Sequence, residues 1–226
     1  MFKKVVSLFV RFLLIVIFLA GTLFTRGHSL PVVQAASVWY VDANIVRSGD
    51  GTTWATALKN LQPAIDAARV GDTIRVAQGF YLPTTARLAA DPRTKSFILK
   101  DGVQIMGSYL SGTPLRDPRN YPSILSGDLD MNDMNKDGNF INETWETEVG
   151  NNAYSVVYGQ NLSNTTILDG FIITGGFADN PDEEIYKQGG GVHIIGGAPV
   201  FKNLLVSGNT ALYFRHRGGG MWFDQG

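Results

Sequence analysis

The chain has no cysteine among its 226 residues, so no disulfide can stabilise it and no lipid can be attached through an N-terminal cysteine. It also lacks a basic excess, since 19 Lys and Arg stand against 20 Asp and Glu. A protein that works outside the cytoplasm without disulfides must be held together by packing or by bound metal. These absences indicate a near-neutral protein whose stability depends on packing or on bound metal.

Long apolar runs are missing everywhere except at the N-terminus. Residues 12–24 read "FLLIVIFLAGTLF", with three basic residues before them and the small residues of "VQAAS" after them. This order is typical of a secretory signal peptide, and the run is short for a membrane span. We therefore expect a signal peptide over 1–36, cleaved after Ala35 or Ala36. An uncleaved N-terminal anchor is the alternative.

Removing this segment changes the charge balance of the chain. The mature part keeps 15 basic and 20 acidic residues, a net charge of −5. A mildly acidic surface argues against nucleic acid and anionic membranes as partners, and we expect no membrane insertion of the mature segment. The predicted location is secreted, extracellular or cell-surface, with the bacterial outer membrane as one such surface.

One amphipathic helix is predicted, near the start of the mature chain. Its apolar face is formed by Leu58, Leu61, Ile65 and Ala68. Pro63 limits where this helix can begin because proline is best tolerated in a first turn, and Gly71 ends it. Strands are expected on either side, in "VWYV" and "DTIRVAQGFY". We interpret 37–82 as an N-terminal cap made of a strand, this helix and a first coil.

Five aromatic residues also fall within this cap. They are Trp39, Tyr40, Trp54, Phe80 and Tyr81. Aromatic side chains of this kind often plug the first coil of a repeat structure beneath its cap, and this is the interpretation we favour. A carbohydrate-binding platform is the alternative.

The rest of the chain, 83–226, repeats itself. Short apolar runs alternate with Gly, Asn, Asp and Pro, which indicates many short strands. Placing "ILDGFIITGG" over "VFKNLLVSGN" aligns Gly170 with Asn203 and Phe171 with Leu204, and two GGG signatures begin at Gly189 and Gly218. A fainter echo in "IMGSYLSG" aligns Gly107 with Gly170 and Leu110 with Ile173. Similar but unequal offsets are typical of a solenoid whose coils carry loops of different length.

The residues at matched positions suggest how one coil is built. Gly170 and Asn203 fit a bend that needs left-handed backbone, which Gly and Asn adopt most easily. An Asn at such a bend can also pass hydrogen bonds from coil to coil. The triple glycines allow neighbouring backbones to approach closely. We therefore predict an all-β fold, a right-handed parallel β-helix with a short N-terminal capping α-helix.

Two stretches resemble known proteins. "WYVDAN…GDGTTWATALKNLQPAIDAARVGDTIRVAQGFY" is similar to the opening of secreted bacterial right-handed parallel β-helix proteins of the pectin-lyase-like type. The run "ILSGDLD…TTILDGFIITGG…GGGV…APVFKNLLVSGNTA…GGGMW" resembles the polymorphic outer membrane protein repeat. It departs from the strict F-x-x-N form of that repeat, because Leu204 stands three positions after Phe201 and Asn203 comes one residue early. The resemblance implies the fold, while activity varies widely among such proteins.

An insertion at about 128–146 carries the strongest local motif. "DMNKDG", from Asp133 to Gly138, is D-x-N-x-D-G, the first half of a calcium loop with oxygen ligands at alternate positions. Thr144 occupies the closing position where Glu is expected. The candidate ligands for a structural Ca²⁺ are Asp128, Asp130, Asp133, Asn135, Asp137, Asn139 and Glu143. A solvated Asp/Asn loop is the alternative.

Catalytic patterns are weak in this sequence. The basic candidates for a lyase are Lys202, Arg215 and Arg217, with His193 and His216 nearby, but "RHRGGG" reads as a solvated loop and His193 as an outward-facing strand residue. We find no paired-Asp strand motif of a hydrolase and assign no catalytic residue. Whether the chain belongs to an enzyme stays open, with a non-enzymatic protein favoured.

The function that follows is a secreted or cell-surface adhesion or binding scaffold. Glycans or surface proteins are its expected partners. The first alternative is the N-terminal part of a polysaccharide lyase or glycoside hydrolase with its active site in later coils. The second is a structural spacer. Because "GGGMWFDQG" stops inside a coil, we also expect further coils of a longer chain to follow.

Overall fold

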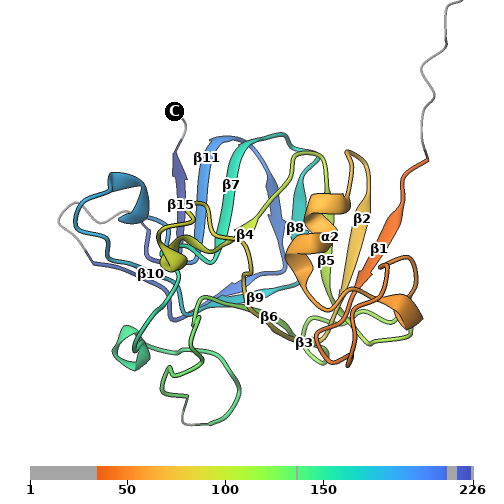
Figure 1. The fold of residues 1–226 in the computed structure, drawn as a ribbon, viewed down its shortest axis with the longest axis horizontal. Coiled ribbons are helices and arrows are strands. Elements are labelled where there is room, and N and C mark those ends of the chain that lie inside the picture. Colours follow the sequence, from red (N-terminus) through yellow and green to blue (C-terminus); the bar gives the residue numbers. More distant parts are fainter. Residues whose placement is uncertain (1–34, 136, 213–217, 225–226) are drawn as a thin grey trace, which may run out of the picture. The chain divides into compact units, whose positions relative to one another are not determined.

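The chain passes repeatedly through three sheets of parallel strands (Figure 1). The computed structural model describes residues 35–135, 137–212 and 218–224. Within these ranges the fold is mostly β with little helix, and the strands do not close into a barrel. The all-β prediction is confirmed at this level. The predicted signal peptide lies, apart from its last two residues, outside the described residues.

Each sheet takes one strand from each passage of the chain. The first sheet has the order β1 (Val38–Val41), β2 (Thr73–Ala77), β5 (Gln104–Tyr109), β8 (Ile167–Asp169) and β12 (Val200–Lys202). The second sheet has the order β3 (Gly79–Tyr81), β6 (Ser123–Ser126), β9 (Ile172–Thr174) and β13 (Leu205–Val206). The third sheet has the order β4 (Phe97–Ile98), β7 (Val157–Leu162), β11 (Val192–Gly197) and β15 (Met221–Asp224).

The remaining elements are short. Strands β10 (Phe177–Ala178) and β14 (Thr210–Ala211) form a parallel pair of their own. Among the described residues, the α-helix is α2 (Leu61–Ala67). Single 3₁₀ turns are η1 (Trp54–Thr56), η2 (Pro92–Thr94), η3 (Trp145–Thr147) and η4 (Glu184–Tyr186).

The strand register pairs the segments that were aligned in the sequence. Leu168 pairs with Phe201 and Ile173 pairs with Val206, both 33 positions apart, and Val192 pairs with Met221, 29 positions apart. Across successive strands, partners are 31, 63 and 33 positions apart in the first sheet and 44, 48 and 33 in the second. The strands therefore stay in register while the loops between them differ in length.

The alignment of "IMGSYLSG" with "ILDGFIITGG" is correct at Gly107 and wrong at Leu110. Ile105 pairs with Leu168, which places Gly107 level with Gly170 as predicted. Ile173, however, pairs with Leu125 and not with Leu110. The reason is an excursion of the chain between β5 and β6, which carries Leu110 away before the second sheet is reached.

The corner between the first and second sheets uses left-handed backbone, as predicted. Gly170 has φ +79° and Asn203 has φ +48°. The Asn203 amide donates to Asp169 Oδ1 at 2.8 Å, a bond from one coil to the next. The Asn that serves turn backbone is a different one: Asn209 accepts from Gly176 N and donates to Ile173 O. Sequence reasoning missed Asn209.

The triple glycines bring backbones into close contact, again as predicted. A Cβ placed on Gly190 would collide with Thr210 O, and one placed on Gly191 would collide with Gly220 O. Backbone bonds at the same place run from Gly191 N to Gly219 O at 3.0 Å and from Val192 N to Gly220 O at 2.9 Å. Side chains at these positions would push the coils apart.

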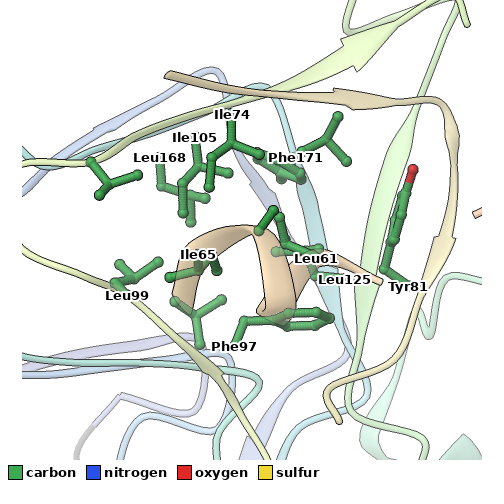
Figure 2. Packing of buried hydrophobic residues seen from close by; sticks show 14 of the residues in the cluster. Leu61, Ile65, Ile74, Tyr81, Phe97, Leu99, Ile105, Leu125, Leu168 and Phe171 are labelled. Carbon is green, nitrogen blue, oxygen red and sulfur yellow. The ribbon is translucent and has the colours of Figure 1, made fainter. Parts of the chain in front are cut away.

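The interior is filled by residues from all three sheets, and α2 packs against it (Figure 2). Leu61 and Ile65 of the helix pack with Ile74, Ile105 and Leu168 of the first sheet. Pro63 lies in the first turn and the helix ends at Ala67, so the helix prediction is confirmed, although Leu58 falls before it and bridges to Val41. Each fully buried apolar side chain contributes roughly 1.5–3 kcal/mol relative to exposure.

Candidate functional site

An apolar column runs along the outer surface of the second sheet. Because strand residues alternate between faces, Tyr81, Leu125 and Ile173 enter the core. Their neighbours Phe80, Ile124, Ile172 and Leu205 are aligned by the strand register on the outside. We call these four residues the outer column. Leu205 is 51% exposed, so one end of the column is open to solvent.

Two hollows lie at the ends of the outer column. The larger, of about 270 Å³, is lined by Ser108, Pro118, Gly170, Phe171, Ile172, Asn203, Leu204 and Leu205. The smaller, of about 120 Å³, is lined by Phe80, Ser126, Asp128, Met131, Asp133, Asn135, Phe140 and Asn142. We call the smaller one the acidic hollow. It is formed where the long β6–β7 insertion folds back over the second sheet.

The floor of the acidic hollow is polar and held in place. Asp128 is 8% exposed and accepts hydrogen bonds from Asn132 N at 3.1 Å and Asp133 N at 3.0 Å. Asp133 accepts from the side chain of Asn152 at 2.8 Å and from Val149 N at 2.7 Å. Burial raises the pKa of Asp128, and the neighbouring charges of Asp133 and Asp130 raise it further.

The rim of the acidic hollow is apolar. Phe140 is 54% exposed and Met131 is 62% exposed, and the ring of Phe140 lies 5.3 Å from that of Phe80. Phe140 has φ +63° and Met131 has φ +56°. Left-handed backbone costs a residue with a side chain roughly 1–2 kcal/mol, so both rim residues are displayed at a cost in stability.

The seven predicted calcium ligands separate into two sets. Asp128 and Asp133 line the acidic hollow, and Asp130 lies beside them, accepting from Asn151 N. The other set is held together by Asn139, whose amide donates to Asp137 Oδ2 at 2.8 Å and to Glu143 Oε1 at 3.2 Å. Asn135 joins the two sets: it lines the hollow and donates to Asn139 Oδ1 at 3.2 Å.

The separation of the predicted ligands into two sets affects how they could bind a metal ion. Across 35–135, 137–212 and 218–224, no three acidic or histidine side chains converge closely enough to hold a metal ion. A calcium site here would have to combine carboxylates with amide and backbone oxygens, which Ca²⁺ accepts readily. The D-x-N-x-D-G motif stays the basis of that prediction.

Glu148 is an ionisable group of the same insertion that sequence reasoning missed. Burial raises its pKa to about 8, and the charges of Asp133 and Asp179 act in the same direction, while the hydroxyl of Thr210 lowers it. A carboxyl group whose pKa lies near neutral, close to a second carboxyl group, is an arrangement that general acid and base chemistry uses. No pattern in the sequence marks Glu148, because Thr210 and Asp179 come from later passages of the chain.

The third sheet carries a different column, covered by other loops. Tyr158, His193 and Trp222 are aligned by register on its outer surface. Arg87 from the β3–β4 loop lies 4.1 Å above the Tyr158 ring and 4.8 Å from the Tyr186 ring. His193 faces away from the core, as predicted, but it is only 2% exposed because other loops cover this face. Burial and the nearby Arg87 charge lower its pKa to about 4.

The predicted basic candidates do not form a site among the described residues. Lys202 is exposed at the end of β12, and His193 is buried on the third sheet. Arg215, His216 and Arg217 lie outside the part of the chain that the structure describes. The aromatic residues of the cap also divide: Tyr81 enters the core, whereas Phe80 faces the acidic hollow.

Comparison with models of protein families, with curated proteins and with solved structures finds no match to this chain. Among the described residues, no helix has the length and apolar character needed to cross a membrane. The functional argument therefore depends on the geometry of the site itself.

Proposed function

We propose that this chain is a right-handed parallel β-helix that works as a secreted or cell-surface binding module, contacting its partner through the outer column and the two hollows beside it. The fold proposal is supported by three parallel sheets visited in turn, by in-register stacking and by the left-handed corner at Gly170 and Asn203. The resemblance of the cap and of the GGG repeats to secreted β-helix proteins supports the location.

The observation that supports the binding function is the open end of the outer column at Leu205, together with the exposed rim of the acidic hollow. Exposed apolar side chains gathered beside concave, polar-lined surfaces are typical of interaction sites. Leu205, Met131 and Phe140 are exposed at or beside the two hollows, while the matching column of the third sheet is covered. Glycans or surface proteins are the partners this surface would contact.

The test compares two equally exposed leucines on different faces. Leu205→Lys places a charge on the outer column, and Leu88→Lys places the same charge on the β3–β4 loop, at a side chain 50% exposed. With the labelled full chain, we expect saturable binding to arrayed glycans or to cell surfaces to be lost in Leu205→Lys and kept in Leu88→Lys. Equal loss in both variants would contradict the proposal, and no binding by the unmodified chain would favour a spacer.

A glycoside hydrolase or lyase is the second candidate, and Glu148 beside Asp133 is the observation that favours it. If this pair is catalytic, the full chain should release reducing ends or unsaturated products from a polysaccharide, and Glu148→Gln should abolish that release. Product formation that persists in Glu148→Gln would place the chemistry elsewhere.

A structural Ca²⁺ in the β6–β7 insertion is a further proposal, supported by the D-x-N-x-D-G motif. Ca²⁺ should raise the melting temperature of the full chain, and EDTA or Asp137→Ala should reverse that rise. A melting temperature indifferent to Ca²⁺, EDTA and Asp137→Ala alike would remove the site.

A further inference from the structure

The acidic hollow combines an apolar rim with an acidic floor, and this combination restricts what can enter it. Met131 and Phe140 stand exposed at its edge, while Asp128 and Asn142 are almost fully buried at its base. A ligand that fits must present an apolar stem to the rim and a positively charged or donating tip to the floor. A bare cation would leave the aromatic rim without a role.

The floor has acceptors to spare. Asp128 receives one N–H on each carboxylate oxygen, and an ionised carboxylate offers about four acceptor positions. Asn135 Oδ1 is buried in the lining and has no hydrogen-bond partner. A donor-rich cationic tip would satisfy such oxygens, whose isolation is costly when buried.

The charge of the acidic hollow also favours a cationic ligand. Asp128 and Asp133 lie together on a floor whose described residues include no basic side chain. A cation docked between them relieves their mutual repulsion, whereas an acidic sugar would add to it. The aromatic rim contributes as well, because an ammonium or guanidinium near the face of Phe140 is attracted by the ring.

The character of the rim separates the remaining ligands. The hollow has a volume of about 120 Å³. One extended side chain fills such a space, and a pyranose ring with its hydroxyls would need polar groups around its whole edge, where Met131 and Phe140 stand.

The left-handed backbone of the rim supports a role in binding. Met131 and Phe140 are two of the five described non-glycine residues with positive φ, and the others are Ser and Asn. Met131, at 62% exposure, gains little in the free protein from being both strained and exposed, whereas Phe140 also contacts Phe80.

We propose that the acidic hollow receives a lysine or arginine side chain of a partner protein, with its stem between Met131 and Phe140 and its charged tip on Asp128, Asp133 and Asn135. This proposal rests on the binding function above and narrows it to a protein partner that presents a basic residue.

The test uses short capped peptides that differ in one side chain. Acetylated, amidated peptides of identical sequence carry arginine, lysine, citrulline or norleucine at the central position, and amide shifts of the full chain are followed by NMR in EDTA. We expect arginine or lysine to bind at least tenfold more tightly than citrulline or norleucine, with an affinity that falls as salt is raised. Equal binding of arginine and citrulline would overturn the proposal.

Variants identify the site. Phe140→Gly should weaken arginine binding at least fivefold. Its effect on the melting temperature is the balance between relief of the left-handed strain and loss of the contact with Phe80. Asp128→Asn should weaken binding at least tenfold. Glu146→Gln removes one charge from an exposed position of the same insertion and should retain the affinity of the unmodified chain. Equal loss in Glu146→Gln would reduce the effect to net charge and overturn the proposal.

Competing ligands complete the design. Methyl hexosides or Ca²⁺ that shift the Phe140 and Asp128 signals, with no response to arginine peptides, would overturn this proposal while leaving the wider binding function intact. If arginine peptides bind at the hollow but Leu205→Lys has no effect on binding to surfaces or glycans, the outer column fails and the hollow stands.

Discussion

The second and third sheets share one interior but treat their outer surfaces in opposite ways. On the third sheet, Arg87 and Tyr186 cover the column of Tyr158 and His193. On the second sheet, the folded-back insertion covers Ile124 yet leaves Leu205 open and holds Phe140 and Met131 outward. Covering lowers the exposed apolar area of a face, whereas display raises it at a cost in backbone strain. This difference between the two faces is the basis of the proposed binding function.

The comparison between the two faces requires that both depend on the same buried interior, and the largest expected effect tests this. Phe171→Ala removes a fully buried ring that lies between the sheets and should cost about 3–5 kcal/mol of unfolding free energy. Urea unfolding followed at both faces should shift to the same new midpoint. Phe223→Ala, at a ring 43% exposed on β15, is the control and should cost about 1 kcal/mol or less. Separate midpoints for the two faces would show independent units.

The covered face should depend on the shape of Arg87 more than on its charge. Arg87→Ala removes the side chain that lies on two tyrosine rings and uncovers His193, so it should cost about 2 kcal/mol. Arg87→Met keeps the packing volume without the buried charge and should cost less than about 1 kcal/mol. Denaturant unfolding measures both. A Met variant as damaged as the Ala variant would mean that the cation–π contacts dominate.

The pH dependence of stability should have opposite signs on the two faces. The pKa of His193 is lowered to about 4 from 6.5, so the unfolded chain binds the extra proton first and stability is lost as pH falls from 6.5 toward 4. The charged and titratable groups near it are Arg87, Tyr158, Tyr186 and Asp224. The size is on the order of 2 kcal/mol.

Glu148 makes stability depend on pH in the opposite direction to His193. Its pKa is raised from 4.5 to about 8, so the folded protein holds its proton and stability is lost as pH rises from 4.5 through 8. Melting temperatures between pH 4 and 8 should flatten on the acid side in His193→Gln and on the alkaline side in Glu148→Gln. A variant that leaves the profile unchanged would show that its group does not titrate as described.

The smallest effect concerns the strain on the displayed face. Met131→Gly should stabilise the protein by about 0.5–1 kcal/mol, because glycine adopts the left-handed backbone freely. Leu88→Gly, at an exposed loop position without positive φ, should give no gain. A destabilised Met131→Gly would mean that this side chain packs in the free protein after all.

The repeated part of the fold could be predicted because it depends on residues that recur. Gly170, Asn203 and the two GGG signatures mark positions where sterics permit few residues, so spacing alone gave the register later found between β8 and β12. Leu110 was misassigned because an insertion broke that spacing. The helix was predictable from Pro63 and the apolar face of Leu61 and Ile65.

The sites were less accessible to sequence reasoning, for a physical reason. The calcium motif concerns residues close in sequence, and the structure divides its members between two sets of contacts. Arg87 meets Tyr186 and His193 across about a hundred residues, and Phe140 meets Phe80 across sixty. Contacts of that kind follow from how loops return to the coils, and no local pattern encodes them.

The unequal spacing of strand partners has a consequence for how such a protein can change. Because pairing holds each strand on its neighbours, the segments between β5 and β6 and between β6 and β7 can be lengthened, shortened or exchanged while the buried residues keep their order. A protein built in this way can change its surface loops without changing the sheets that carry them.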